Sequence, residues 1–186
     1  NSSDTIAAHG LQLLGQGQVR LEESGNAVNV LAANHQGTIS YQNATSLTIG
    51  TVTDSITGTS TSGITNDTDV KVAADGDISI DQAINVAGQN LFLDATGTIT
   101  QTGTGTITAA GLGIKAGGGA NLDQANDVET LAVDAGGSFT FHDTDGVTIG
   151  SVTENASSLP ITLDGIVTSN DNVAISTATG DITLMQ

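Results

Sequence analysis

Cysteine and tryptophan are absent from this chain of 186 residues, and it holds only one proline, one tyrosine and three phenylalanines. Without cysteine the chain has no disulfide framework, no thiol chemistry and no zinc–thiolate site. Aromatic side chains supply much of the volume of an ordinary core. Because so few are present, the sequence predicts a thin core.

Basic residues are also scarce. The chain has three Lys and Arg residues and 20 Asp and Glu residues, which gives a net charge of −17. That charge repels a phosphate backbone and an anionic bilayer, so we expect no binding to nucleic acid. No apolar run approaches the roughly 18 residues of a membrane span, so we expect no membrane insertion. The first residues lack the features of a signal peptide and do not begin with Met, which favours a processed piece or an excerpt of a longer protein.

A ten-residue pattern recurs along the chain: apolar, any, apolar, any, small, any, Gly, any, apolar, Thr or Ser. Its copies begin at Leu11, Leu31, Val70, Leu91, Leu112 and Leu131, and a copy with one inserted residue begins at Val173. The intervals are 20, 39, 21, 21, 19 and 42 residues. Because 39 and 42 are each close to twice 20, we expect a degenerate copy near residue 51, another near residue 151, and about nine units in all.

Each unit holds three short stretches in which apolar and polar residues alternate; in residues 91–111 they are LFL, TITQ and TITA. Alternation with period two indicates strands with one buried face, which such short strands bury only by stacking on the next unit. The predicted fold is all-β, a right-handed parallel β-helix (β-solenoid) with about 20 residues and three short strands per coil and about nine coils. The helical frame of a leucine-rich repeat and the Gly–Asp nonapeptides of a calcium-binding β-roll are missing.

A longer repeat overlies the short one. Residues 25–53 match residues 125–153 without a gap, with LTIGTVT in one copy and VTIGSVT in the other. The sequence therefore predicts a single segment, 1–186, built of two imperfect modules offset by 100 residues, about 25–124 and 125–186, the second incomplete.

Three stretches carry a resemblance to a known family: NDVETLAVDAGGSFTFHDTDGVTIGSVT, its sister NAVNVLAANHQGTISYQNATSLTIGTVT, and GTITQTGTGTITAAGLGI. They resemble the repeat region of filamentous-haemagglutinin-like bacterial exoproteins, which are two-partner-secretion proteins and giant surface adhesins. The resemblance covers nearly the whole chain. It implies a β-helical shaft at the surface of a Gram-negative-type cell, and it brings no catalytic residues.

The alternation also assigns side chains to the interior or the surface. The residues expected to point inward, stacked from unit to unit, are Leu91, Leu93, Ile99, Leu112, Ile114, Leu131, Val133, Phe139 and Phe141. Phe92 alternates outward beside Lys71, so we expect an exposed aromatic side chain there. The outward residues Asp94, Lys115 and Asp134 fall in one column and are expected to form an exposed ladder of alternating charge.

The densest polar cluster is His142-Asp143-Thr144-Asp145-Gly146. Asp143 and Asp145 match the start of a calcium loop, but the third oxygen ligand and the Glu at the twelfth position are missing. The sister copy has Gln-Asn-Ala-Thr-Ser at this place, so the turn forms without carboxylates. A solvated turn is therefore the favoured interpretation, and a weak Ca²⁺ site at Asp143 and Asp145 is the alternative. No other metal and no cofactor is expected.

An enzyme is not expected. Polysaccharide lyases and hydrolases need clustered carboxylates, often with a basic residue that holds an acidic sugar. The basic residues here are Arg20, Lys71 and Lys115 alone, and the carboxylates Asp75, Asp77 and Asp81, which share a unit, are expected on outward turns without a basic partner. A carbohydrate-active enzyme or a glycan-binding module is kept as the alternative to a structural role.

The sequence thus predicts an extracellular segment of a bacterial cell-surface protein, with a structural or adhesive role as a shaft or filament. The expected partners are further copies in head-to-tail contact or flanking repeats of the same protein; surface glycans and other cells are further candidates. The receptor, the source organism and any calcium dependence are left open.

Overall fold

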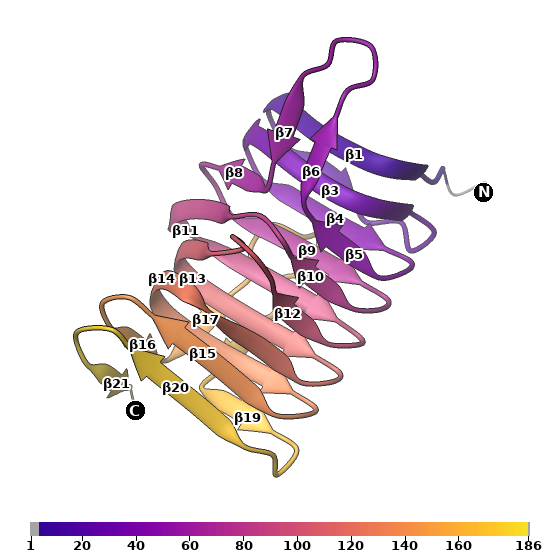
Figure 1. Cartoon of the computed structure of the whole chain (residues 1–186). Coiled ribbons are helices and arrows are strands. Elements are labelled where there is room, and N and C mark those ends of the chain that lie inside the picture. Colours follow the sequence, from indigo (N-terminus) through magenta and orange to yellow (C-terminus); the bar gives the residue numbers. More distant parts are fainter. Residues whose placement is uncertain (1–3, 186) are drawn as a thin grey trace.

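The computed structural model describes residues 4–185, which form twenty-one strands. Their bounds are β1 Ala7–Gln16, β2 Val19–Leu21, β3 Ala27–Gln36, β4 Ile39–Asn43, β5 Leu47–Ile49, β6 Thr51–Thr53, β7 Ser60–Ser62, β8 Ile64–Asn66, β9 Val70–Ala74, β10 Ile78–Ile80, β11 Ile84–Ala95, β12 Ile99–Gln101, β13 Ile107–Ala116, β14 Ala120–Ala135, β15 Phe139–Asp143, β16 Val147–Ile149, β17 Ser151–Thr153, β18 Thr162–Asp164, β19 Ile166–Thr168, β20 Val173–Thr177 and β21 Ile182–Leu184. Figure 1 shows their arrangement. Within residues 4–185 no helix is long and apolar enough to cross a membrane.

Seventeen strands belong to one parallel sheet whose pairings close on themselves. Following the paired neighbours from β3 leads through β5, β10, β12, β14, β13, β11 and β8 and back to β3. These eight strands form a closed, barrel-like ring, and the other strands lie outside it. The all-β prediction is confirmed, but the predicted right-handed β-helix of three short strands per coil is wrong.

Long strands are the reason for this difference. β11 and β14 have 12 and 16 residues, longer than the short stretches that the sequence predicted, and they continue past register shifts in their pairings between Val86 and Asn90 and between Leu122 and Asn126. Each therefore takes part in several pairings, so that β14 alone pairs with β12, β13, β15, β16 and β19. Alternation in the sequence marks which side chains are buried, but it does not reveal where a strand ends.

The central parts of the two expected degenerate copies are not part of the parallel sheet. Residues 50–63 and 150–165 instead form antiparallel hairpins, β6–β7 and β17–β18, which we call arm 1 and arm 2. Each arm leaves the sheet at a glycine and returns at a glycine with φ of +65° (Gly63) or +66° (Gly165), a conformation that favours glycine. The count of about nine units is wrong because these two stretches were included in it.

The predicted register is confirmed where the repeat spacing is near 20. Leu11 is paired with Leu31, and Leu91 is paired with Val70 on one side and Leu112 on the other. Across arm 1 the predicted equivalence of Leu31 and Val70 is wrong, because Val70 is paired with Ile39 and Leu31 with Ile49. The 31 positions from Ile39 to Val70 (70 − 39) therefore contain one repeat and the inserted arm.

The interior is a thin, continuous apolar core, as the composition predicts. All nine residues expected to point inward are at most 1% exposed. Phe139 and Phe141 stack with ring centroids 6.3 Å apart. The core thus runs through the whole sheet and leaves the outward side chains to define any functional surface.

Candidate functional site

One outward column of side chains brings together residues far apart in the sequence. Arg20, Ser40, Lys71, Phe92, Gly113 and Ala132 occupy equivalent positions on successive paired strands. This outer column contains two of the three basic residues of the chain. Because the rest of the protein is strongly acidic, the positive charges of the outer column make it the most favourable place to bind a carboxylate.

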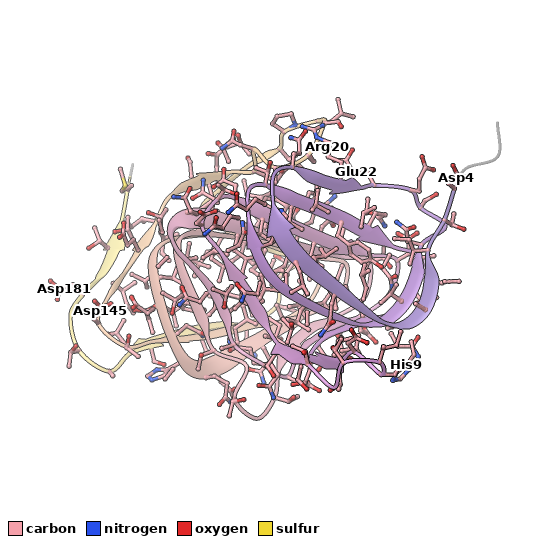
Figure 2. The ribbon with its side chains drawn as sticks, turned by 90° about the horizontal axis from the view of Figure 1, so that it is seen from above. Asp4, His9, Arg20, Glu22, Asp145 and Asp181 are labelled. Carbon is pink, nitrogen blue, oxygen red and sulfur yellow. The ribbon has the colours of Figure 1, made fainter. Side chains whose placement is uncertain are left out.

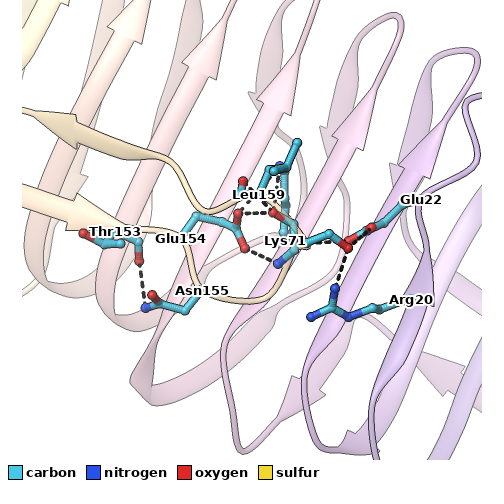
Figure 3. A network of polar contacts seen from close by, with 9 residues as sticks. Arg20, Glu22, Lys71, Thr153, Glu154, Asn155 and Leu159 are labelled. Atoms are coloured by element: carbon cyan, nitrogen blue, oxygen red, sulfur yellow. Dashed lines mark hydrogen bonds and ion pairs between the residues drawn. The ribbon is translucent and has the colours of Figure 1, made fainter.

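Arm 2 lies along the outer column and covers it. Val152 of the arm packs at Gly111 on β13, and the side chain of Asn90 on β11 donates to the carbonyl of Thr153 at 3.1 Å. Figure 3 shows the arm continuing over β9, where Glu154 meets Lys71. The arm is therefore docked along its length.

Phe92 is 1% exposed, so the prediction of an exposed aromatic side chain is wrong. Its position in the outward column is as predicted, but arm 2 contacts the strands on both sides of it. The neighbouring residue in the column, Gly113, leaves room for the ring, since a Cβ there would lie 2.4 Å from Phe92 Cδ2. The arm turns an outward position into a second, small buried layer.

Glu154 and Lys71 anchor the middle of arm 2. Their charged atoms lie 3.7 Å apart, and their side chains are 1% and 15% exposed. The Ser157 amide donates to Glu154 Oε1 at 2.5 Å, and the Ser157 hydroxyl donates to Oε2. A carboxylate buried so completely needs such partners. Within residues 4–185 this is the only ion pair closer than 4 Å.

The tip of arm 2 reaches the far end of the outer column. The Ser158 amide and hydroxyl both donate to Glu22, at 3.1 and 2.7 Å, and Arg20 donates to the Ser158 hydroxyl at 2.5 Å (Figure 3). Burial raises the pKa of Glu22, but hydrogen bonds from Ser40 and Ser158 and the charge of Arg20 outweigh it, so that the pKa is lowered. Glu22 is therefore held as an anion.

A cleft of about 190 Å³ lies beside the arm tip. It is lined by Glu22, Ser40, Tyr41, Gln42, Lys71, Ala73, Ser157, Ser158 and Leu159. Ligand pockets are commonly about 300 to 1,000 Å³ in volume, and the charged groups here are already bonded to the arm. The geometry fits a docking seat for the arm itself rather than a substrate pocket.

The predicted charge column is present, but its direct ion pairs are not. Lys115 lies between Asp94 and Asp134 on adjacent strands, in the predicted register. The three side chains line a shallow groove of about 400 Å³. No charged pair among them is within 4 Å, so the interaction is through solvent.

Asp143 and Asp145, the candidate Ca²⁺ ligands, differ in their surroundings. Asp143 is fully buried, and it accepts hydrogen bonds from the amides of Val128, Asp145 and Gly146 at 3.0 to 3.2 Å. Burial raises the pKa of Asp143, against the lowering effect of these bonds. Asp145 is exposed. Backbone amides thus use the oxygens that a cation would need, and no cluster of three metal-ligating side chains occurs in residues 4–185.

Sequence reasoning missed the residues that make the docked arm: Glu154, Ser157 and Ser158. One signal in the sequence could have pointed to them: the two copies of the long repeat differ in sequence here, with GTVTDSITGTS in arm 1 and GSVTENASSLP in arm 2. A comparison of the chain with models of known families, with curated proteins and with solved structures finds no match.

Proposed function

We propose that the chain is a self-associating structural or adhesive segment of a secreted bacterial surface protein. The observation that carries the proposal is the set of strands that, among residues 4–185, are paired on one side only. At one end these are β1 and β2, and at the other end β19, β20 and β21. Strands with a free edge present unpaired amides and carbonyls that pair readily with another chain.

The C-terminal edge also exposes the ends of the apolar core. Leu184 is paired in register with buried Ile149, yet it is 71% exposed, and Met185 is 65% exposed. Val173 continues the row of Phe139 and is 47% exposed. Contact with another copy, or with flanking repeats of the same protein, would cover these side chains.

The N-terminal edge of one copy can pair with the C-terminal edge of another, because continuous ladders of paired strands connect the two edges within each copy. One ladder runs from Gly10 on β1 through β3, β5, β10, β12, β14 and β15 to Ala174 on β20. Another runs from β2 through β4, β9, β11, β13 and β14 to β19. A copy added in the same direction places β20 beside β1 and β19 beside β2, and this contact repeats without closing.

Charge opposes this association. Figure 2 shows Asp145 and Asp181 at one end of the molecule and Asp4 and Glu22 toward the other. Repulsion between such surface charges is screened within about 8 to 10 Å at physiological salt. The proposed location outside the cell rests on the resemblance of the repeats alone, and the proposal includes no catalytic step, cofactor or nucleic-acid partner.

Light scattering and electron microscopy of the 186-residue chain across a salt series test the proposal. We expect particles that lengthen as salt and protein concentration rise. Leu184→Lys, at the edge, should abolish growth, whereas Leu159→Lys on the arm tip, with a side chain equally exposed in the monomer, should not. A monomer at every salt and protein concentration would overturn the proposal.

A further inference from the structure

The two arms carry the same kind of carboxylate turn, at positions 100 residues apart (154 − 54 = 100). In arm 2 the amide and the hydroxyl of Ser157 donate to the two carboxylate oxygens of Glu154, three positions earlier. In arm 1 the amide and the hydroxyl of Thr57 donate to the two oxygens of Asp54, again three positions earlier, at 3.4 and 2.9 Å. The surroundings of Glu154 are therefore an internal template for those of Asp54.

Both arms also lie over the sheet at the same place relative to their bases. The base of arm 2 is hydrogen-bonded to β14, and the base of arm 1 is hydrogen-bonded to β3. Val152 packs at Gly111 on β13, and Val52 packs at Gly10 on β1; a Cβ on these glycines would lie 3.3 and 2.8 Å from a valine methyl group. Because β13 is paired with β14 and β1 with β3, each valine lies over the second strand from its base.

The carboxylate of arm 2 meets a cation two strands further on. From Gly113 on β13 the outer column continues to Phe92 and then to Lys71 on β9, whose ammonium lies 3.7 Å from Glu154. Beneath arm 1 the sheet ends with β1, which among residues 4–185 is paired with β3 only (Figure 1). In that part of the chain no basic group lies within 4 Å of Asp54. A cation for Asp54 would have to come from strands added beyond β1.

The strand pairings identify the residues that an added copy supplies there. The ladder from Gly10 leads to Ala174 on β20, so that, two residues further along both strands, Gln12 corresponds to Ser176. On β15 the partner of Ser176 is His142, and the two side chains are hydrogen-bonded at 2.9 Å. An added copy would therefore continue the row beneath arm 1 with Ser176 and then His142.

These two residues take the places that Phe92 and Lys71 hold beneath arm 2. Ser176 is much smaller than Phe92, so arm 1 can lie closer to the sheet, which suits the shorter side chains of Asp54 and His142. His142 is half-exposed, and it is the only Lys, Arg or His residue after Lys115 in the sequence. The one group of the C-terminal strands that can carry a positive charge is thus in line with the carboxylate of arm 1.

We propose that Asp54 binds the protonated imidazole of His142 in a second copy of this chain, as Glu154 binds Lys71 within one chain. This inference rests on the proposed function, because it requires β20 of the added copy to lie beside β1. Hydrogen bonds from Ile56 and Thr57 lower the pKa of Asp54, so the carboxylate is held as an anion. A histidine side chain gains its positive charge between pH 8 and pH 5.

Loss of the charge at position 54 has opposite effects on a contact and on simple repulsion. Because the net charge of −17 opposes association, removal of an uninvolved carboxylate should favour assembly. Asp54→Asn should instead raise the protein concentration at which assembly begins, by about fivefold at pH 6 and fixed salt. Asp127→Asn, at an exposed position on β14, is the matched control and should lower that concentration or leave it unchanged. Easier assembly in both variants would overturn the contact.

A second variant tests whether the two side chains act together. His142→Gln should also raise the concentration at which assembly begins, and the double variant Asp54→Asn/His142→Gln should be no worse than either single variant, because both changes remove one contact. His142→Lys keeps a cation and should assemble as readily as the unaltered chain. Additive effects of the two single changes would overturn the pairing of Asp54 with His142.

Cross-linking locates the contact, because the chain has no cysteine of its own. Under assembly conditions a short bis-maleimide, which unlike a disulfide does not need Cα atoms closer than about 7 Å, should join Asp54→Cys chains to His142→Cys chains. Thr183→Cys in place of His142→Cys is the control, since exposed Thr183 lies on β21, whose ladder leads from Leu184 to β2. Assembly without the 54–142 product, or with equal product at 183, would overturn the contact and leave the proposed function standing. Absence of assembly by the unaltered chain would overturn both.

Discussion

Buried amide side chains at the ends of strands show how closely single residues are matched to their surroundings. Asn43 is fully buried; its Oδ1 accepts the Val28 amide at 2.9 Å, and its Nδ2 donates to the carbonyls of Val28 and Thr45 at 3.0 Å. At the sister position, Asp143 faces amides instead, from Asp145 and Gly146. The two turns therefore require different donors and acceptors although their sequences align.

Asn43→Asp should destabilise the protein by about 3 kcal/mol or more. The oxygen that replaces Nδ2 would face the carbonyl oxygens of Val28 and Thr45, and a buried acceptor without a donor is costly even though Oδ1 keeps its donors, the Val28 amide and the Tyr41 hydroxyl. Urea unfolding at pH 7 measures the effect. Asn121→Asp, the same change at an exposed position, is the control and should change stability by less than about 0.5 kcal/mol; equal losses in both variants would contradict the argument.

Glu22 gives a prediction about pH. Its pKa lies below its ordinary value of 4.5, because its hydrogen bonds to serines and the charge of Arg20 outweigh the effect of burial. The contact with arm 2 is therefore fully present above pH 4.5 and is lost as the pH falls through the lowered pKa. The amide resonance of Ser158 should titrate with that lowered midpoint. The titration should vanish in Glu22→Gln and persist in Glu23→Gln.

At the scale of elements, the arms convert outward surface into buried contacts. Arm 2 covers Phe92 and buries Glu154 against Lys71, which lies 83 positions earlier in the chain (154 − 71 = 83). This contact attaches the hairpin to β9, a strand from the first half of the chain. Loss of one partner leaves the other charge buried without compensation.

Lys71→Met should therefore destabilise the protein by about 2 to 4 kcal/mol, because Glu154 would stay buried and unpaired. Adding Glu154→Gln should recover more than half of this loss, since the neutral amide can still bond to Ser157. Urea unfolding of both single variants and of the double variant measures the coupling between them. Lys115→Met, in the open groove, is the matched control. A double variant no more stable than Lys71→Met would show that Glu154 is not held by Lys71.

At the scale of the whole molecule, excess negative charge acts over the entire surface. The net charge is −17, and the only cation between Asp94 and Asp134 is Lys115. Because the three charges are not in direct contact, their interaction is weak and screened by salt.

Lys115→Glu places three carboxylates in one column and changes the net charge to −19 (−17 − 2). We expect a loss of less than about 1 kcal/mol at low salt, and a smaller loss at higher salt. Thermal unfolding across a salt series measures it, with Lys115→Gln as the control for loss of the cation alone. A loss that does not depend on salt would mean that packing, and not charge, is responsible.

The sequence by itself determined the all-β class, the inward row from Leu91 to Phe141 and the register between repeats about 20 residues apart. These follow from local alternation, which each strand carries in its own residues. Only the tertiary structure decided that the strands near Ala87 and Asn126 run on, that the ladder closes, and that residues 50–63 and 150–165 leave it. It also decided the burial of Phe92, Glu154 and Lys71, because a side chain that alternates outward is exposed only if no other segment lies over it.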